Sequence, residues 1–206
     1  MIDTEKLYPA SFFEKRARYT WRAPIVCGSI ASWFELNGWP LESAVDLGCA
    51  IGDLVQGFLD LGIEAFGFDG SAAARPYIVC PTDRWDVLDL RKPLGSAFEE
   101  FHVDVCTCFE VAEHLEEEYA DQFIENLCCL SDVIIMSACP PHPTKKATKY
   151  HPNEQPIEYW IEKFDAAGYA ENESMYNFFR KAWAPWRKRY GIAAFWQNLV
   201  CFRRNK

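Results

Sequence analysis

The stretch Val45-Asp46-Leu47-Gly48-Cys49-Ala50-Ile51-Gly52-Asp53 decides the fold of this chain. It begins in an apolar run, 43–47, that is typical of a buried strand, and it leads into an apolar pattern of helical period. Between the two, Gly48 and Gly52 let the backbone turn tightly and approach a ligand, and Ala50 is the next smallest choice. In an open α/β sheet, ligands bind where the carboxyl end of a strand turns into a helix. We therefore expect a ligand at this turn.

Strand and helix patterns alternate along the rest of the chain. The strands that we expect lie at 43–47, 64–68, 83–88, 103–109, 132–138, 169–175 and 193–202. The helices that we expect lie at 25–36, 53–61, between the fourth strand and Leu130, and at 156–167. This alternation predicts an α/β fold with a doubly wound, Rossmann-like, mostly parallel sheet.

The domain organisation follows from length and pattern. With 206 residues, half of them hydrophobic, the chain fits a single domain with a substantial core. We expect an N-terminal helical extension over 1–40 and the main domain over 41–206. Within it, the aromatic and basic segment 176–192, interrupted by Pro185, is predicted to be a substrate-facing insertion.

The composition also bears on location. No apolar run approaches the roughly 20 residues that a membrane span needs, and the charged N-terminus lacks the apolar core of a signal peptide. The nine cysteines are odd in number and do not have the spacing of a disulfide scaffold. We therefore expect a cytoplasmic protein with no membrane partner.

Charge is distributed unevenly. Residues 175–206 contain eight of the 21 Lys and Arg residues and none of the 30 Asp and Glu residues. A basic tail on an acidic body indicates a local site for an anion and argues against binding to a long nucleic-acid duplex.

Acidic residues flank the first turn and end the second strand. Asp46 precedes the turn, where it suits the amino group of an amino-acid ligand and would repel a diphosphate. Asp69 follows the second strand, where a carboxylate can accept hydrogen bonds from ribose hydroxyls.

These residues resemble the class I S-adenosylmethionine-dependent methyltransferases over about residues 40–175. The turn resembles the family's first motif, with Ala50 where glycine is more usual, and Asp69 matches its ribose-binding acid. The resemblance implies a seven-stranded sheet with an antiparallel last strand, and S-adenosylmethionine as cofactor. The cofactor-binding residues that it implies are Asp46, Gly48, Cys49, Ala50, Gly52, Asp69, Gly70, and Asp89 with Leu90 beside the adenine.

Two other functions were weighed. A nicotinamide-dependent Rossmann oxidoreductase would need G-x-G-x-x-G from Gly48, but Ala50 and Asp53 stand where glycines are required. A catalytically inactive cofactor-binding module remains an alternative function, although the acids at positions 46, 69 and 89 favour functional cofactor binding.

The residues Glu110, Glu113 and His114 follow the fourth strand. If a helical turn begins at the end of that strand, all three project to one side. On spacing alone, they also suit the solvated first turn of a helix.

This E-x-x-E-H string is similar to that of metal-dependent O-methyltransferases acting on RNA 3′ ends and on ubiquinone precursors. The resemblance implies a divalent metal, Mg²⁺ or Mn²⁺, on Glu110, Glu113, His114 and a downstream histidine, with His151 preferred and His142 second. Without a metal, His114 or His151 becomes the general base.

The acceptor is predicted only by class. Residues 176–202 interleave aromatic side chains, which stack on bases or sugar rings, with Arg and Lys, which bind phosphates. We expect O-methylation of a hydroxyl on a small molecule, a sugar, a nucleotide or an RNA end. The oligomeric state is left open.

Overall fold

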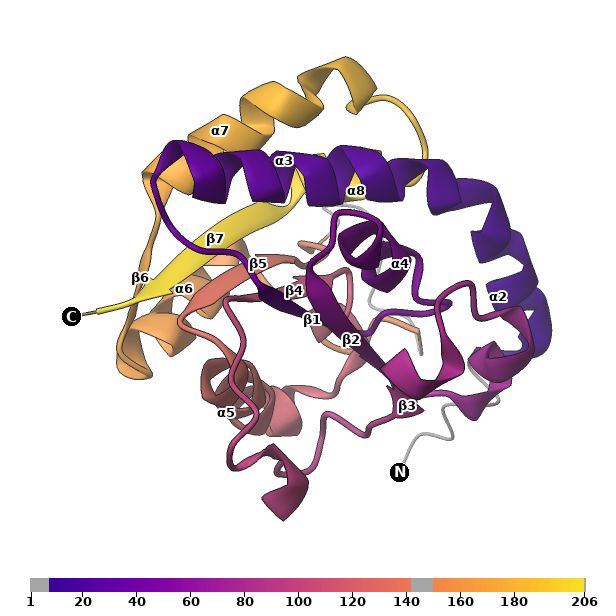
Figure 1. Ribbon diagram of the computed structural model, residues 1–206. Helices are drawn as coiled ribbons and strands as arrows, with labels where there is room; N and C mark the ends of the chain where they lie inside the picture. The colour runs from indigo at the N-terminus through magenta and orange to yellow at the C-terminus, as the bar shows by residue number, and fades with distance from the viewer. Residues whose placement is uncertain (1–7, 142–149, 206) are drawn as a thin grey trace. The chain divides into compact units, whose positions relative to one another are not determined.

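The structure is a computed structural model that describes residues 8–141 and 150–205. The chain divides into two compact units, Met1–Asp89 and Leu90–Lys206. Figure 1 shows strands and helices in both units. Each unit is described in turn.

The first unit contains three parallel strands in the order β3-β2-β1. Its strands are β1 (Ser43–Leu47), β2 (Glu64–Asp69) and β3 (Trp85–Val87). Its α-helices are α2 (Ala10–Arg16), α3 (Ala23–Leu36) and α4 (Asp53–Leu59), and its 3-10 helices are η1 (Ala17–Arg22), η2 (Ala72–Tyr77) and η3 (Thr82–Arg84).

Small residues and a stop signal shape this unit. Helix α3 ends at Asn37-Gly38, as the sequence predicts, because Gly38 adopts the left-handed conformation with φ 66°. Helices α3 and α4 approach closely at Gly57, where a Cβ atom would lie 2.9 Å from the Ala23 Cβ. A larger residue at 57 would push the two helices apart.

The second unit contains four strands in the order β4-β5-β7-β6. Strands β4 and β5 are parallel, and β7 is antiparallel to both β5 and β6. The strands are β4 (Val105–Phe109), β5 (Val133–Ser137), β6 (Tyr169–Glu171) and β7 (Leu199–Arg204). The α-helices are α5 (Ala120–Leu130), α6 (Ile157–Ala166), α7 (Glu173–Trp183) and α8 (Ala193–Gln197). The 3-10 helices are η4 (Ser96–Phe98), η5 (Ala112–His114), η6 (Glu117–Tyr119) and η7 (Ala184–Trp186).

The fold class is confirmed: an α/β, Rossmann-like fold with seven mostly parallel strands and an antiparallel last strand. Two expected strand boundaries are wrong. The strand expected at 169–175 ends at Glu171, because Met175, Phe179 and Trp183 recur at helical spacing and are all buried on α7.

The strand expected at 193–202 begins only at Leu199. Residues 193–197 form α8 instead, and this short helix buries Phe195. The division into an extension over 1–40 and a domain over 41–206 stays a prediction, although α2, η1 and α3 make most of the first segment helical.

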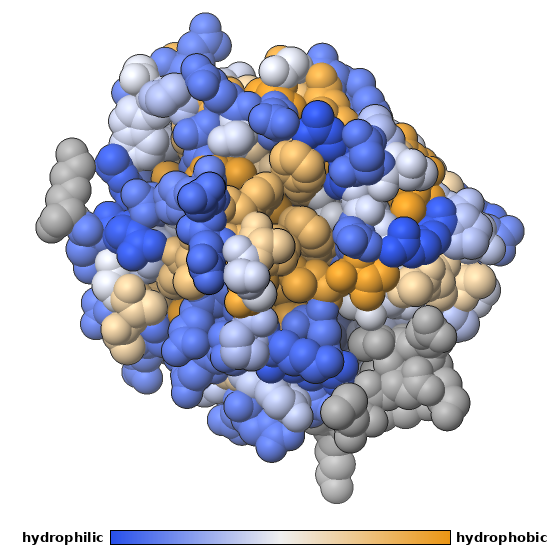
Figure 2. All heavy atoms as spheres, turned by 60° about the horizontal axis from the view of Figure 1, so that its bottom comes forward, coloured by the Kyte–Doolittle hydropathy of each residue, from blue (hydrophilic) through white to orange (hydrophobic). Residues whose placement is uncertain are grey.

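Hydrophobic side chains are mostly buried, as a chain half hydrophobic in composition requires. Figure 2 shows one face on which hydrophilic side chains predominate and apolar ones are exposed near the middle. Among the helices formed by residues 8–141 and 150–205, none has the length and apolar character needed to span a bilayer.

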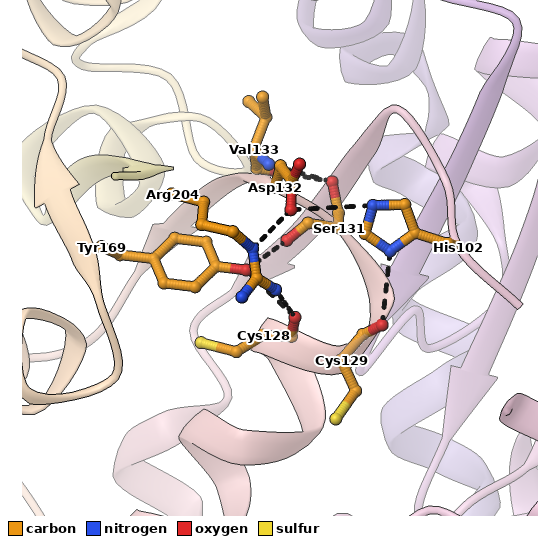
Figure 3. A network of polar contacts seen from close by, with 8 residues as sticks. All are labelled: His102, Cys128, Cys129, Ser131, Asp132, Val133, Tyr169 and Arg204. Atoms are coloured by element: carbon orange, nitrogen blue, oxygen red, sulfur yellow. Dashed lines mark hydrogen bonds and ion pairs between the residues drawn. The ribbon is translucent and has the colours of Figure 1, made fainter. Parts of the chain in front are cut away.

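A polar network joins the end of α5 to strands β6 and β7 (Figure 3). The buried Tyr169 hydroxyl lies 3.0 Å from the Cys128 carbonyl oxygen and 2.8 Å from that of Ser131, both of which can accept its hydrogen bond. Arg204 donates to the Asp132 carboxylate and to the Cys128 carbonyl. The network satisfies carbonyl groups at the carboxyl end of α5, which have no partner within the helix.

Replacing Tyr169 with Phe should lower the free energy of unfolding by about 1–2 kcal/mol, because the hydrogen bond from its buried hydroxyl to the Ser131 or Cys128 carbonyl oxygen is lost. Urea denaturation measures this change. Tyr190→Phe is the matched control, since Tyr190 is 70% exposed. Equal effects of the two substitutions would contradict a role for the buried hydroxyl.

Candidate active site

The turn between β1 and α4 is built from left-handed residues. Gly48, Ala50 and Gly52 have φ values of 74°, 51° and 74°. Ala50 is strained in this region, where a side chain costs roughly 1–2 kcal/mol. Both of its backbone groups are held: its N–H donates to Asp69 Oδ2 and its carbonyl accepts from Trp85 Nε1, each at 2.9 Å. These bonds offset the strain and fix the turn.

Asp69, at the end of β2, organises this turn. Its Oδ2 accepts from the Ala50 N–H and its Oδ1 from the Ser71 N–H, both at 2.9 Å. Burial raises the pKa of Asp69 to about 6, although these hydrogen bonds and the charge of Arg16 favour the ionised form. The side chain is only partly exposed, and each carboxylate oxygen can accept a further hydrogen bond.

Most of the other predicted cofactor residues of the first unit lie close to Ala50 or Asp69 in the chain. Asp46 and Cys49 are buried. A Cβ atom at Gly52 would lie 2.4 Å from Cys80 Sγ, so glycine is required there for space as well as for conformation. Gly70 is exposed and directly follows Asp69.

The predicted pair Asp89 and Leu90 follows β3. The Leu88 N–H donates to the Asp69 backbone carbonyl at 3.0 Å, so the chain leaves β3 beside Asp69 and continues into the partly exposed Asp89. Leu90 is buried in the second unit, where its carbonyl accepts from Asn126 Nδ2. The first unit thus gathers every predicted cofactor residue except Leu90.

A buried ion pair at this site is not predicted by the sequence. Arg22, on η1, donates from Nε to Asp53 Oδ2 at 2.7 Å and from Nη2 to Asp53 Oδ1 at 3.0 Å. Burial alone would lower the pKa of Arg22, but the charge and hydrogen bonds of Asp53, together with the charge of Asp46, raise it. The only signal in the sequence was a basic residue within an aromatic and apolar stretch.

Replacing Arg22 with Met should lower the free energy of unfolding by about 3–5 kcal/mol, because Asp53 is left buried without its cation. The double substitution Arg22→Met with Asp53→Leu should recover most of that loss. Urea denaturation of all three proteins measures it. If the free energy of unfolding of Arg22→Met lies within about 1 kcal/mol of the parent's, the ion pair does not hold η1 to α4.

A second cluster lies at the ends of β4 and β5. Glu110 has a φ of 56°, so the helical turn expected at the end of the fourth strand does not include it. That expectation is wrong because the Glu110 N–H pairs with the Ser137 carbonyl at 2.9 Å, continuing the parallel sheet by one residue. Its carboxylate accepts from Asn198 Nδ2 at 3.1 and 3.3 Å.

Glu113 and His114 lie on η5. Glu113 is only 1% exposed, and its Oε2 atom has no hydrogen-bond partner among the described residues. Burial first, and the charge of Glu110 second, raise the pKa of Glu113 well above its ordinary value, while the Cys139 N–H, which donates to its carboxylate, lowers it. A buried carboxylate with an orphaned oxygen is costly unless a cation or a proton accompanies it.

His114 and His151 stand edge to face, with ring centroids 4.6 Å apart. Nδ1 of His114 lies in hydrogen-bond contact with the Tyr150 carbonyl, and Nδ1 of His151 lies 2.9 Å from Glu154 Oε1. Since both partners are acceptors, each Nδ1 carries a proton and donates it to its partner.

The structure brings together three of the four predicted metal ligands. One donor atom each of Glu113, His114 and His151 lies within 4.8 Å of the others. Glu110 is not a member of this group. His142, the second choice for the fourth ligand, lies outside the described residues.

A further group, missed in the sequence, shares His151. Donor atoms of Cys139, His151 and Glu154 also lie within 4.8 Å of one another. Burial, and then the charges of Glu113, Glu110 and Glu154, raise the pKa of the Cys139 thiol to about 12. The sequence does show that Cys139 closely follows the buried strand β5, which pairs with β4 in the sheet.

The aromatic and basic segment is partly core. Phe179 and Trp183 are fully buried, and the Arg180 guanidinium lies 3.5 Å from the centre of the Trp196 ring. Four cations of this segment are exposed: Lys181, Arg187, Lys188 and Arg189. Their contact with an acceptor, and the substrate-facing role of 176–192, stay predictions.

Comparison with known proteins gives the fold. No protein-family model matches the chain, and no curated protein matches its sequence. Its structure is similar to that of magnesium protoporphyrin IX methyltransferase from Synechocystis PCC 6803 with bound SAH. The TM-score is 0.59 at 17% identity, over 88% of this chain and 83% of that one.

Two further solved structures are similar. One is a putative methyltransferase in complex with the Haloferax volcanii Trm112 methyltransferase activator, with a TM-score of 0.60, 18% identity, and coverage of 82% of this chain and 78% of that one. The other is the methyltransferase domain of bacterial CtHen1, with a TM-score of 0.52, 19% identity, and coverage of 71% and 86%. The chain has a methyltransferase fold.

Proposed function

We propose that this protein is an S-adenosylmethionine-dependent methyltransferase. The observation that carries the proposal is Asp69, whose carboxylate is fixed by the Ala50 and Ser71 amides beside a left-handed turn. A carboxylate in this place accepts hydrogen bonds from ribose hydroxyls, as the resemblance to class I methyltransferases implies. Asp46, buried at the end of β1, suits the amino group of the methionine part.

The acceptor in this proposal is a hydroxyl group of a sugar, a nucleotide or an RNA end. Methyl transfer is an in-line displacement in which the carbon–sulfur bond breaks as the carbon–oxygen bond forms, and the hydroxyl proton must leave. Nε2 of His114 or His151 can take that proton, because Nδ1 of each ring is already a donor.

Divalent-metal assistance is the second part of the proposal. The residues fit a cation: Glu113 Oε2 is buried and unpaired among the described residues, and one donor atom each of Glu113, His114 and His151 lies within 4.8 Å of the others. Glu113, His114 and His151 would hold it, with Glu110 joining if it leaves Asn198. Imidazole ligands favour Mn²⁺ over Mg²⁺. A bound divalent cation lowers the pKa of a hydroxyl that binds beside it.

Calorimetry should detect binding of S-adenosylmethionine and of its demethylated product, and no binding of NAD. Asp69→Asn should weaken binding about 10- to 100-fold, since hydrogen bonds to a charged acceptor are lost. As the pH falls through about 6, the parent should lose affinity because Asp69 becomes protonated, whereas the Asn variant should not respond.

Asp83→Asn is the control for this experiment, because Asp83 is an acid of the same unit whose side chain is 79% exposed. It should leave both the affinity and its pH dependence unchanged. Tight binding of NAD with no response to S-adenosylmethionine would overturn the assignment of the cofactor.

Mn²⁺ should bind the protein, and Glu113→Gln should abolish this binding because a charged ligand is lost. An acceptor screen with labelled cofactor, covering nucleotide sugars, short RNAs and phenols, should give turnover that EDTA removes and Mn²⁺ restores. Glu117→Gln is the control, since Glu117 is exposed on the neighbouring η6. Full turnover in EDTA would exclude the metal and leave a histidine as the base.

A further inference from the structure

The connection between α7 and α8 begins and ends beside β4 (Figure 1). Trp183, the last residue of α7, and Phe195, on α8, both contact Phe109, the last residue of β4. The rings of Phe195 and Phe109 are stacked with centroids 4.3 Å apart, and the centroids of Trp183 and Phe109 are 6.1 Å apart. Glu110 directly follows Phe109. Both ends of the connection 184–192 are therefore held at the sheet edge that carries the second cluster.

Reciprocal contacts between α7 and α8 fix the connection further. Trp196 Nε1 donates to the Arg180 carbonyl at 2.8 Å, and Nη1 of Arg180 donates to the Trp196 carbonyl. The Arg180 guanidinium also lies 3.5 Å from the centre of the Trp196 ring. Within the connection, the Arg189 N–H donates to the Trp186 carbonyl at 2.8 Å, and Ile192 is fully buried. A surface held in this way loses little conformational entropy when a ligand binds.

Three cations of this surface are not neutralised by acids. Lys181, Arg187 and Lys188 are exposed, and none of them forms an ion pair with a described residue. Nη1 of Arg187 donates to the Ala184 carbonyl, which carries no net charge. The segment itself offers no acid, because residues 175–206 contain neither Asp nor Glu. A positive surface therefore remains on a chain of net charge −9, and such a surface attracts an anionic ligand.

Aromatic side chains stand among these cations. Tyr190 is 70% exposed and Trp186 is half-buried. The Arg189 guanidinium lies 5.7 Å from the centre of the Trp186 ring. Aromatic faces stack on nucleobases, whereas Arg and Lys bind phosphate groups. A ligand with both a base and a phosphate uses both kinds of side chain, whereas an inorganic anion uses only the cations.

An anionic membrane is the competing partner for a surface of cations and aromatic rings. A helix that lies in a membrane surface inserts its apolar face between the lipids. The apolar face of α7 consists of Met175, Phe179 and Trp183, which are all buried in the protein. The structure therefore favours a nucleotide ligand over a membrane.

We propose that Lys181, Arg187 and Lys188 bind the phosphate groups of a nucleotide or of a single-stranded oligonucleotide, and that this surface presents a hydroxyl of that ligand to the second cluster. The inference rests on the proposed function and narrows its acceptor to a phosphorylated one. The phosphate contacts hold the ligand in place, and the rings of Trp186 and Tyr190 stack on its bases.

Fluorescence anisotropy with a fluorescein-labelled oligouridylate measures binding to the full-length protein. The logarithm of the association constant should fall with the logarithm of the salt concentration at a slope of about −2, because each phosphate neutralised on a single strand contributes about −0.7. Unlabelled UDP should compete with the strand, and uridine should not. Binding of the strand at least about tenfold more tightly than UDP identifies an oligonucleotide as the ligand, and equal affinities identify a single nucleotide.

Replacing Lys181, Arg187 and Lys188 together with Gln should weaken binding of the strand at least about tenfold and remove about 2 from the salt slope. Calorimetry of the same variant should show unchanged binding of S-adenosylmethionine, which also checks that the variant is folded. A triple variant that binds the strand as tightly as the parent would overturn the inference.

The matched control removes the same amount of charge from exposed cations outside residues 175–206, by Lys15→Gln, Arg18→Gln and Lys92→Gln. It should leave binding of the strand unchanged. A parent that binds S-adenosylmethionine but neither UDP nor the strand would overturn the inference and leave the cofactor in place. Binding to phosphatidylserine vesicles in that case would assign the surface to a membrane. A parent that does not bind S-adenosylmethionine would overturn the proposed function instead.

Discussion

Parallel strands carry their carboxyl ends to the same edge of a sheet, and both candidate sites include residues from the segments that follow these ends. In the first unit, Leu47 pairs with Phe68, and the N–H groups of Gly48 and Cys49 both donate to the Phe68 carbonyl. This pairing sets the turn against Asp69. In the second unit, Phe109 pairs with Ser137, which brings the segment after β4 against Cys139. A change of register in either pair would separate the acid from its partner and remove the site.

The two sites also share a backbone feature. Ala50 and Glu110 are the non-glycine residues with positive φ among those described, and each directly follows the sheet pairing of a parallel strand. Such residues cost roughly 1–3 kcal/mol each and persist where the surroundings over-determine them. Ala50 is held by Asp69 and Trp85, and Glu110 by the Ser137 carbonyl and by Asn198. At Ala50 the bond that holds the backbone also orients the Asp69 carboxylate, whereas at Glu110 separate bonds from Asn198 orient the carboxylate.

The sequence predicts what is local and misses what the tertiary structure adds. The turn at 48–52 and Asp69 could be found because glycines and an acid follow apolar runs at fixed places. The start of α7 was assigned to a strand because residues 173–175 are too few to distinguish a helical pattern from the end of the preceding strand. The conformation of Glu110 depends on the Ser137 carbonyl, which is distant in the sequence. The same holds for Arg22 with Asp53 and for Cys139 with His151, since no local spacing records such pairs.

In the proposed function, the arrangement of Glu113, His114 and His151 is the argument for a cation over a lone histidine base. A general base needs one imidazole, held by an acceptor at Nδ1, and His151 with Glu154 already supplies that pair. A base alone explains neither the second imidazole, held in the same way by the Tyr150 carbonyl, nor the buried Glu113 oxygen, for which residues 8–141 and 150–205 offer no hydrogen-bond partner. One donor atom of each of these three side chains lies within 4.8 Å of the others, a spacing that suits ligands of a single cation. Burial raises the pKa of Glu113 and so disfavours its charged form, and in the proposal a divalent ion would favour that form while binding both imidazoles.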